Sequence, residues 1–321
     1  HDNSHYNRPH METQPVDPGP ELGPQFHTDS PFTARMRRHQ SWYRAEVLKL
    51  PFGSGPNLTN KAPLGNMLRL EDGELGKNFL VPHIFTIAKR RVAEPAIPVN
   101  RFSLLCNMLS NQAAAFNLLG LLVDDRELAT TLLQAIDPDE VDTVEKVSLV
   151  HSPTPAQTYL NDQTTFDGFV EYKRTNGQKG FWGIVLPLID ESPGRVVSHP
   201  SYWEEARRPD SPWAEASWPQ LITPETHQLW QKHLLAESIR HNSPAQYTEG
   251  RLLVLPHPQN EPGLDRLRSY ASILKPGSNS PIILPMDQLI QLWKSVVRKE
   301  AHHAWLAEFS RRYLELDRSG S

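Results

Sequence analysis

The chain has 321 residues, of which 38% are hydrophobic and 22% charged, and this is enough to bury a full core. Its formal net charge of -4 excludes a protein that binds nucleic acid through overall basicity, so such a contact needs a local basic patch. No apolar run reaches the roughly 18 residues of a membrane span, so we expect no membrane partner.

Cys106 is the single cysteine, which excludes an intramolecular disulfide and predicts a reducing, cytoplasmic location. It lies in an apolar helical pattern without a Cys or His at metal spacing, and this predicts a buried core thiol. His39, His302 and His303 lack acidic partners at ligand spacing, so we expect them to face solvent from helices. These residues predict no metal centre.

The two ends of the chain lack the pattern of a folded core. Residues 1–10 are histidine-rich and are interpreted as an expression-vector remnant before Met11. Residues 11–30 are rich in proline, glycine and acid, and we expect them to be disordered. Residues 31–317 are predicted to form a single domain, with a helical part at 31–137 and a sheet-containing core at 140–317.

The first half of the chain is predicted to be mainly helical. Ser30 as N-cap and Pro31 at the first helical position begin a helix that we expect to end near residue 50. A loop rich in glycine, proline and asparagine follows. Apolar periodicity then predicts helices at 77–92, 102–122 and 124–136, and the second of these has the clearest apolar face.

In the second half, strands alternate with helices. Residues 144–151 alternate at period two, and residues 164–191 are predicted to form a hairpin around the turn NGQKG. Further strands are expected at 251–256 and 281–284, and helices at 224–240, 264–274, 286–298 and 300–316. This order predicts an α/β fold with a central mixed β-sheet flanked by helices and a helical N-terminal part.

Short segments in order from residue 38 to residue 316 match one family. They are QSWYRAE (40–46), GNML (65–68), LEDGE (70–74), NFL (78–80), SNQ (110–112), FNL (116–118), HSP (151–153), TFDGFVEY (165–172), GFWGI (180–184), QLW (228–230), HLLA (233–236) and RYL (312–314). The sequence resembles a bacterial family of restriction-endonuclease-like proteins within the PD-(D/E)xK nuclease superfamily. The resemblance implies a restriction-endonuclease-like core, DNA as a partner and a place in DNA defence or repair.

The resemblance also implies a catalytic motif on the hairpin, with an acid on its first strand and Glu-x-Lys on its second. The acid falls on Asp167, which is present, whereas the Glu falls on Val185 and the Lys on Pro187. Residues i and i+2 of a strand share a face, so the intact motif sets two carboxylates and a lysine side by side to bind Mg²⁺ and activate water. Valine and proline supply neither group. We therefore expect Asp167 to hold metal weakly at most, and we expect no cofactor.

The preferred hypothesis is a nuclease-fold protein that has lost catalysis and acts as a DNA-binding or regulatory module. Its candidate nucleic-acid contacts are two basic clusters and a nearby ring, namely Arg35, Arg37, Arg38, Lys89, Arg90, Arg91 and Trp42. Solvated helix faces are the other interpretation of the same charges. Gln112 faces either the former catalytic site or a helix neighbour.

Two alternatives stay open. The first is an active Mg²⁺-dependent DNA endonuclease with a rearranged set, in which Asp167 acts with Glu171 and Lys173 or with Asp190. The second is a protein–protein adaptor in which the tryptophan-rich segment at 202–230 forms the interface. The sequence leaves the oligomeric state and the choice between a DNA and a protein partner open.

Overall fold

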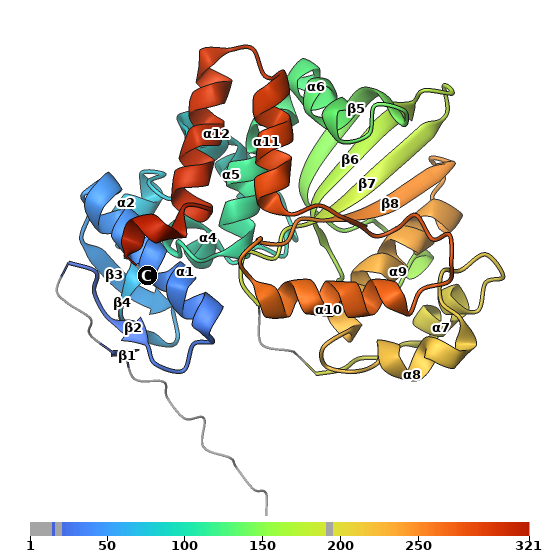
Figure 1. The fold of residues 1–321 in the computed structure, drawn as a ribbon, viewed down its shortest axis with the longest axis horizontal. Helices are drawn as coiled ribbons and strands as arrows, with labels where there is room; N and C mark the ends of the chain where they lie inside the picture. The colour runs from blue at the N-terminus through green and yellow to red at the C-terminus, as the bar shows by residue number, and fades with distance from the viewer. Residues whose placement is uncertain (1–14, 17–20, 191–194, 321) are drawn as a thin grey trace, which may run out of the picture.

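A computed structural model of the chain describes residues 15–16, 21–190 and 195–320. The interpretation of residues 1–10 as a vector remnant lies outside the described residues. Five strands form the central sheet in the order β5-β6-β7-β8-β9 (Figure 1). They are β5 (Val141–His151), β6 (Phe166–Arg174), β7 (Lys179–Val185), β8 (Glu249–Val254) and β9 (Ile282–Ile283). The first three are antiparallel and the last three parallel, which confirms the predicted mixed sheet.

Alternate residues of the strands point to opposite faces of the sheet and pack into two hydrophobic cores. Trp182 and Ile184 belong to the larger core, and their neighbour Phe181 belongs to the smaller one. The larger core lies under α5 (Asn111–Asp124) and α6 (Arg126–Ile136), against which α12 (Glu300–Tyr313) and α11 (Met286–Val296) pack. The smaller core lies under α9 (His227–Asn242), with α7 (Pro200–Ala206), α8 (Trp218–Leu221) and α10 (Glu261–Ser272) around it (Figure 1).

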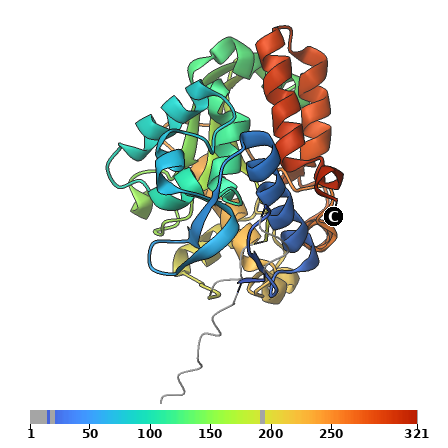
Figure 2. The same ribbon diagram turned by 90° about the vertical axis from the view of Figure 1, so that its left-hand side faces the viewer.

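The N-terminal part is mainly helical, as predicted, and packs against the end of the chain. It comprises β1 (Pro15–Val16), β2 (Gln25–Phe26), α1 (Pro31–Trp42), the π-helix η1 (Tyr43–Leu48), β3 (Phe52–Pro56), β4 (Lys61–Leu68), α2 (Leu70–Glu74), α3 (Pro82–Val92) and α4 (Arg101–Cys106). Figure 2 shows α1 beside α12. The Gln40 amide donates to the backbone carbonyl of Arg312 at 2.8 Å, so the first and last long helices are joined by a buried hydrogen bond.

Two expectations for the N-terminal part are wrong. Residues 21–30 are ordered, because the buried guanidinium of Arg44 holds the Glu21 carbonyl at 2.7 Å and Arg37 pairs with Asp29 at 2.6 Å. The expected loop after η1 is a β-hairpin, in which β3 and β4 pair antiparallel. Tertiary contacts therefore order segments whose composition favours disorder or a loop.

The helix expected at 102–122 is broken into α4 and α5. Asn107 leaves the helix with extended backbone angles and forms a bridge with Met67 of β4. The Ser110 side chain then caps α5 by accepting from the Ala113 N–H at 3.1 Å. Because the helix is broken here, Ser110 and the first turn of α5 lie at the end of the sheet, where the candidate site lies.

The remaining helices follow the sequence pattern with small shifts of their ends. The helix expected from residue 77 begins at Pro82, since proline favours the first helical position. Cys106 is buried, as predicted, and burial raises the pKa of its thiol to about 11. Within the described ranges, no helix combines the length and the apolar character needed to cross a bilayer.

Candidate functional site

The candidate site lies where β6 begins and β7 ends. Gly168 of β6 is paired with Ile184 of β7, and continuing this antiparallel register by one residue sets Asp167 opposite Val185. The carboxylate of Asp167 accepts a hydrogen bond from the backbone N–H of Leu186, with 2.7 Å between Oδ2 and N. Asp167 and Val185 therefore occupy the same face of the sheet, the face under α9.

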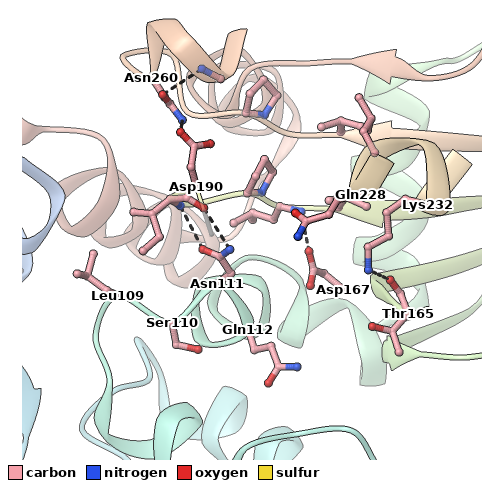
Figure 3. A pocket seen from close by; sticks show the side chains of 18 of the residues that line it. Leu109, Ser110, Asn111, Gln112, Thr165, Asp167, Asp190, Gln228, Lys232 and Asn260 are labelled. Atoms are coloured by element: carbon pink, nitrogen blue, oxygen red, sulfur yellow. Dashed lines mark hydrogen bonds between the residues drawn. The ribbon is translucent and has the colours of Figure 1, made fainter. Parts of the chain in front are cut away.

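A cavity of about 720 Å³ opens over this pair (Figure 3). Its wall is built from the first turn of α5, the ends of β6, β7 and β8, the side of α9 and the first turns of α10. Polar side chains line it from every one of the helices, namely Ser110, Asn111, Gln112, Gln228, Lys232, Asn260 and Arg266. Val185 and Pro187 also line the cavity, together with Asp167.

Asp167, Asp190, Lys232 and Arg266, four of the charged groups that line the cavity, are engaged with protein partners. The Lys232 ammonium donates to the backbone carbonyl of Thr165, close to Asp167. Asp190 forms an ion pair with Arg266, and its second oxygen accepts from the Asn260 amide at 3.2 Å. Asn111 holds the neighbouring backbone by accepting from the Ile189 N–H at 3.1 Å. The cavity wall is thus cross-linked by polar contacts.

The donor set does not fit a divalent metal ion. Mg²⁺ prefers several oxygen ligands, and at this site Asp167 lies beside Val185 and Pro187, whose side chains supply none. Asp190 lines the same cavity, but its carboxylate is neutralised by Arg266. In the part of the chain that the structure describes, no group of three or more His, Cys, Asp or Glu side chains is placed to hold a metal.

The comparison with protein families gives the decisive observation. The model of the family described as the PD-(D/E)XK nuclease superfamily matches residues 27–315, nearly the whole described chain. The chain belongs to the PD-(D/E)XK nuclease superfamily. The mixed sheet flanked by helices is the restriction-endonuclease-like fold of this superfamily. The comparisons with curated proteins and with solved structures give no match.

In this PD-(D/E)XK protein, the first basic cluster consists of Arg35, Arg37 and Arg38 of α1, and each of these residues has a structural partner. Arg37 is buried and pairs with Asp29, while Arg38 donates to the Ser319 carbonyl at 3.2 Å. Arg35 donates to Gln259 at 2.7 Å, which links α1 to the segment before α10. The Trp42 ring stacks on His39, with 5.1 Å between ring centroids. These contacts hold the N-terminal part to the rest of the fold.

The second basic cluster lies on α3, and one of its members is also structural. Arg91 donates to the carbonyls of Leu149 and Val150 at the end of β5, each at 2.6 Å. Arg90 forms an exposed ion pair with Asp124 at 2.8 Å. The Lys89 ammonium lies over the Phe85 ring at 4.5 Å. None of the seven basic and aromatic candidates lines the cavity above Asp167.

The alternative catalytic residues on β6 lie away from the cavity. Glu171 is four residues from Asp167, roughly 13 Å along the strand, and accepts a hydrogen bond from the Tyr247 hydroxyl. Lys173 lies 4.0 Å from Asp142 of β5. The structure therefore brings Asp167 together with Asp190, Gln112, Val185 and Pro187, but not with the Glu171–Lys173 pair.

The tryptophans of the 202–230 segment pack inward. Trp213 and Trp230 are fully buried, and Trp203 and Trp218 pack against the same core. The tryptophan-rich segment thus covers one face of the sheet.

The expectation that His39 faces solvent is wrong. His39 is buried, and its Nε2 lies 2.8 Å from the Arg311 carbonyl.

Sequence reasoning missed the α9 residues of the cavity. Gln228 and Lys232 are four residues apart, so they lie on one face of α9 and both reach the site. They fall inside or beside the family-like segments QLW and HLLA, whose apolar residues fill the core. The i, i+4 spacing of two polar residues on an otherwise buried helix was the available signal.

Proposed function

We propose that this protein keeps the nuclease fold without the metal-dependent reaction and acts as a DNA-binding or regulatory module. The observation that carries the proposal is the pairing of Asp167 with the Leu186 N–H beside Val185. This is the position at which hydrolysis by the superfamily mechanism needs a second carboxylate and a lysine. A single carboxylate already bonded to the backbone is a poor Mg²⁺ ligand set.

The polarity of the cavity supports nucleic acid as the ligand. Lys232, Arg266 and six asparagine or glutamine residues line it, together with the carboxylates of Asp167, Asp190 and Glu225. Lysine, arginine and amide groups are the ones that contact phosphate oxygens in protein–DNA complexes.

The rearranged endonuclease is less well supported. Glu171 and Lys173 are bonded to other elements of the fold, away from the cavity. Asp190 shares the cavity with Asp167, but a metal ion there would have to displace Arg266 and Asn260. Breaking these two partly buried contacts costs free energy.

The first experiment tests cleavage. Plasmid, linear and single-stranded DNA are incubated with the full chain and Mg²⁺ or Mn²⁺, beside the Asp167→Ala variant. We expect no product above background for either protein. Metal-dependent cleavage that disappears in Asp167→Ala would overturn the proposal in favour of the rearranged endonuclease.

The second experiment separates DNA from a protein partner. Fluorescence anisotropy with labelled single- and double-stranded oligonucleotides is measured over a series of salt concentrations. If Lys232 contacts a phosphate, Lys232→Met lowers the salt slope by about one and weakens binding, because one fewer counterion is released. Lys294→Met, which removes the same charge from the exposed side of α11, is the control. No binding at low salt leaves a protein partner as the module's ligand.

A further inference from the structure

Two neighbouring helices, α7 and α9, are joined by a histidine that lies between two carboxylates (Figure 1). His241 is in the last turn of α9, and its Nδ1 lies 3.0 Å from an oxygen of Glu205 in α7. Its Nε2 lies 3.1 Å from an oxygen of Asp210, which follows α7. The His241 side chain is 11% exposed, so the ring itself is shielded from water. Both nitrogens of one imidazole ring therefore face acids.

The two carboxylates determine the protonation state of the ring. An ionised carboxylate only accepts hydrogen bonds, so each ring nitrogen that faces one must carry a hydrogen. The other contacts of Glu205 are with donors as well, since Arg208 Nε lies at 3.2 Å and the Asn242 amide donates at 3.1 Å, which favours the ionised form. An imidazole with a hydrogen on both nitrogens is the imidazolium cation. The observed arrangement thus requires a charged His241.

The charges around His241 balance when the ring carries its second proton. The charged groups near it come from the end of α7, the segment after it and α9, and they are Glu205, Arg208, Asp210, Glu237 and Arg240. Three acids meet two arginines, so the imidazolium supplies the third positive charge. The hydrogen bond to Glu205 raises the pKa of His241 above 6.5 against the opposing effect of burial, and Asp210 adds to the rise.

Deprotonation removes one of the two hydrogen bonds, and burial decides which one. A neutral imidazole has a single N–H, so its other nitrogen presents a lone pair to a carboxylate oxygen. The Glu205 side chain is 6% exposed and is costly to leave unpaired, whereas the Asp210 side chain is 60% exposed and can bind water instead. The remaining hydrogen therefore stays on Nδ1 toward Glu205, and the Asp210 carboxylate is released.

Asp210 belongs to a turn beside a second cavity. Residues 209–212 line this cavity, which has a volume of about 460 Å³, and Glu237 and Arg240 of α9 line it as well. The Ser211 N–H donates to the Arg208 carbonyl at 3.0 Å and closes the turn that carries Asp210. Without the His241 contact, the Asp210 carboxylate keeps only the longer contact of 3.6 Å with Arg240 among its ion pairs within the described ranges. The wall of the cavity is then held less firmly on this side.

We propose that His241 is a pH-sensitive latch: the imidazolium holds Asp210 and the turn at 208–211 against α9, and loss of its proton frees the turn and opens the second cavity. A group whose pKa is raised by folding stabilises below its unfolded value and loses this effect as the pH rises through the folded value. The latch is therefore closed at low pH and open at high pH. Among the described residues that line the cavity above Asp167, none belongs to the latch, so the two features are separate.

The protonation of the ring is tested by NMR on the full chain. The ring nitrogens of histidine-labelled protein are followed from about pH 5.5 to about pH 9, and His241 is assigned as the signal that is missing from His241→Gln. We expect both nitrogens to carry hydrogens beyond pH 6.5, and Nε2 to be the one that loses its hydrogen. A neutral ring at about pH 6 would overturn the proposal.

The movement of the turn is tested by hydrogen exchange. Amide exchange of residues 208–213 is measured by mass spectrometry over the same pH range and corrected for the intrinsic rate. Protection of these amides should fall about tenfold as His241 loses its proton, the effect of losing one charged hydrogen bond. The amides of β7 are the internal reference and should keep their protection. Unchanged protection of residues 208–213 across the titration would contradict the latch.

A matched pair of variants assigns the effect to the contact between His241 and Asp210. Asp210→Asn keeps the shape of the side chain and removes its charge, so protection at about pH 6 should already be reduced and should change little with pH. His303→Gln removes an exposed histidine of α12 and should behave as wild type. A thermal melt checks that both variants are folded. The same pH dependence in wild type and Asp210→Asn would overturn the proposal.

Discussion

Asp167 and Leu186 are joined by a hydrogen bond of 2.7 Å from the Leu186 backbone N–H to the Asp167 carboxylate, across the ends of β6 and β7. The bond ties down the chain just after Val185, where β7 stops pairing with β6. Asp167, the residue that we propose corresponds to the catalytic acid of the superfamily, is thus a strand-end contact in this protein. Its removal should affect the fold, and this can be measured apart from any activity.

Asp167→Ala should lower the free energy of unfolding by about 1–3 kcal/mol, because it leaves the Leu186 N–H without its acceptor. Asp167→Asn keeps an acceptor oxygen at the same position and should cost clearly less. Urea unfolding of the two variants beside wild type measures both effects. Equal stability of the alanine and asparagine variants would contradict a structural role for the carboxylate.

The double variant Val185→Glu with Pro187→Lys should acquire a Mn²⁺ site, because it adds a second carboxylate on the same face as Asp167. We expect Mn²⁺ to bind at least about tenfold more tightly than to wild type by calorimetry. Val185→Gln with Pro187→Lys has the same shape without the charge and is the matched control. Tight Mn²⁺ binding by wild type would show that the existing residues already hold a metal.

Arg312→Met should destabilise the protein by about 3 kcal/mol. Arg312 is 1% exposed and donates to Gln40 at 3.1 Å and to the Asn78 carbonyl at 2.6 Å, so its loss leaves buried acceptors unpaired. Arg311→Met is the control, since the partly exposed ion pair of Arg311 with Glu308 is worth less than about 1 kcal/mol. Denaturant midpoints of the two variants should differ widely, and similar midpoints would contradict the assignment of Arg312 to the core.

His241 should make stability depend on pH. A hydrogen bond to Glu205, and a second to Asp210, raise the pKa of His241 above its usual 6.5. A group whose pKa is raised by folding stabilises fully below its unfolded value, and this contribution is lost as the pH rises through the folded pKa. The melting temperature of wild type should therefore exceed that of His241→Gln by a larger margin at about pH 5.5 than at about pH 8.5. A difference that grows with pH would be incompatible with this ion pair.

The hairpin and its acid could be predicted from sequence because local chemistry determines them. The turn NGQKG and the period-two pattern define β6 and β7, and the register then sets Asp167 opposite Val185. The partners of this pair could not be predicted in the same way. Lys232 and Arg266 come from helices about 65 and 99 residues beyond Asp167, and only the packing of α9 and α10 on the sheet brings them there.

Two other expectations depended on the charges of the N-terminal part: the disorder expected for residues 21–30 is wrong, and the nucleic-acid contacts of α1 stay a prediction. The basic residues of α1 suggested nucleic-acid contacts, and the acidic, proline-rich segment before it suggested disorder. Asp29 and Arg37 pair with each other, so each explains the other's location. A residue-by-residue interpretation of charge treats both as solvated, because it has no information on which charges meet after folding.

The division of the sheet into two cores has a consequence for the order in which the chain acquires structure during synthesis. The smaller core draws on residues 159–283, so all of its members exist once β9 has been made. The larger core joins Phe32 near the beginning to Leu316 near the end. It stays incomplete until the ribosome has released α12, and the N-terminal helices emerge long before their partner. The apolar residues of α1 and α5 that belong to this core stay uncovered by α12 during that interval.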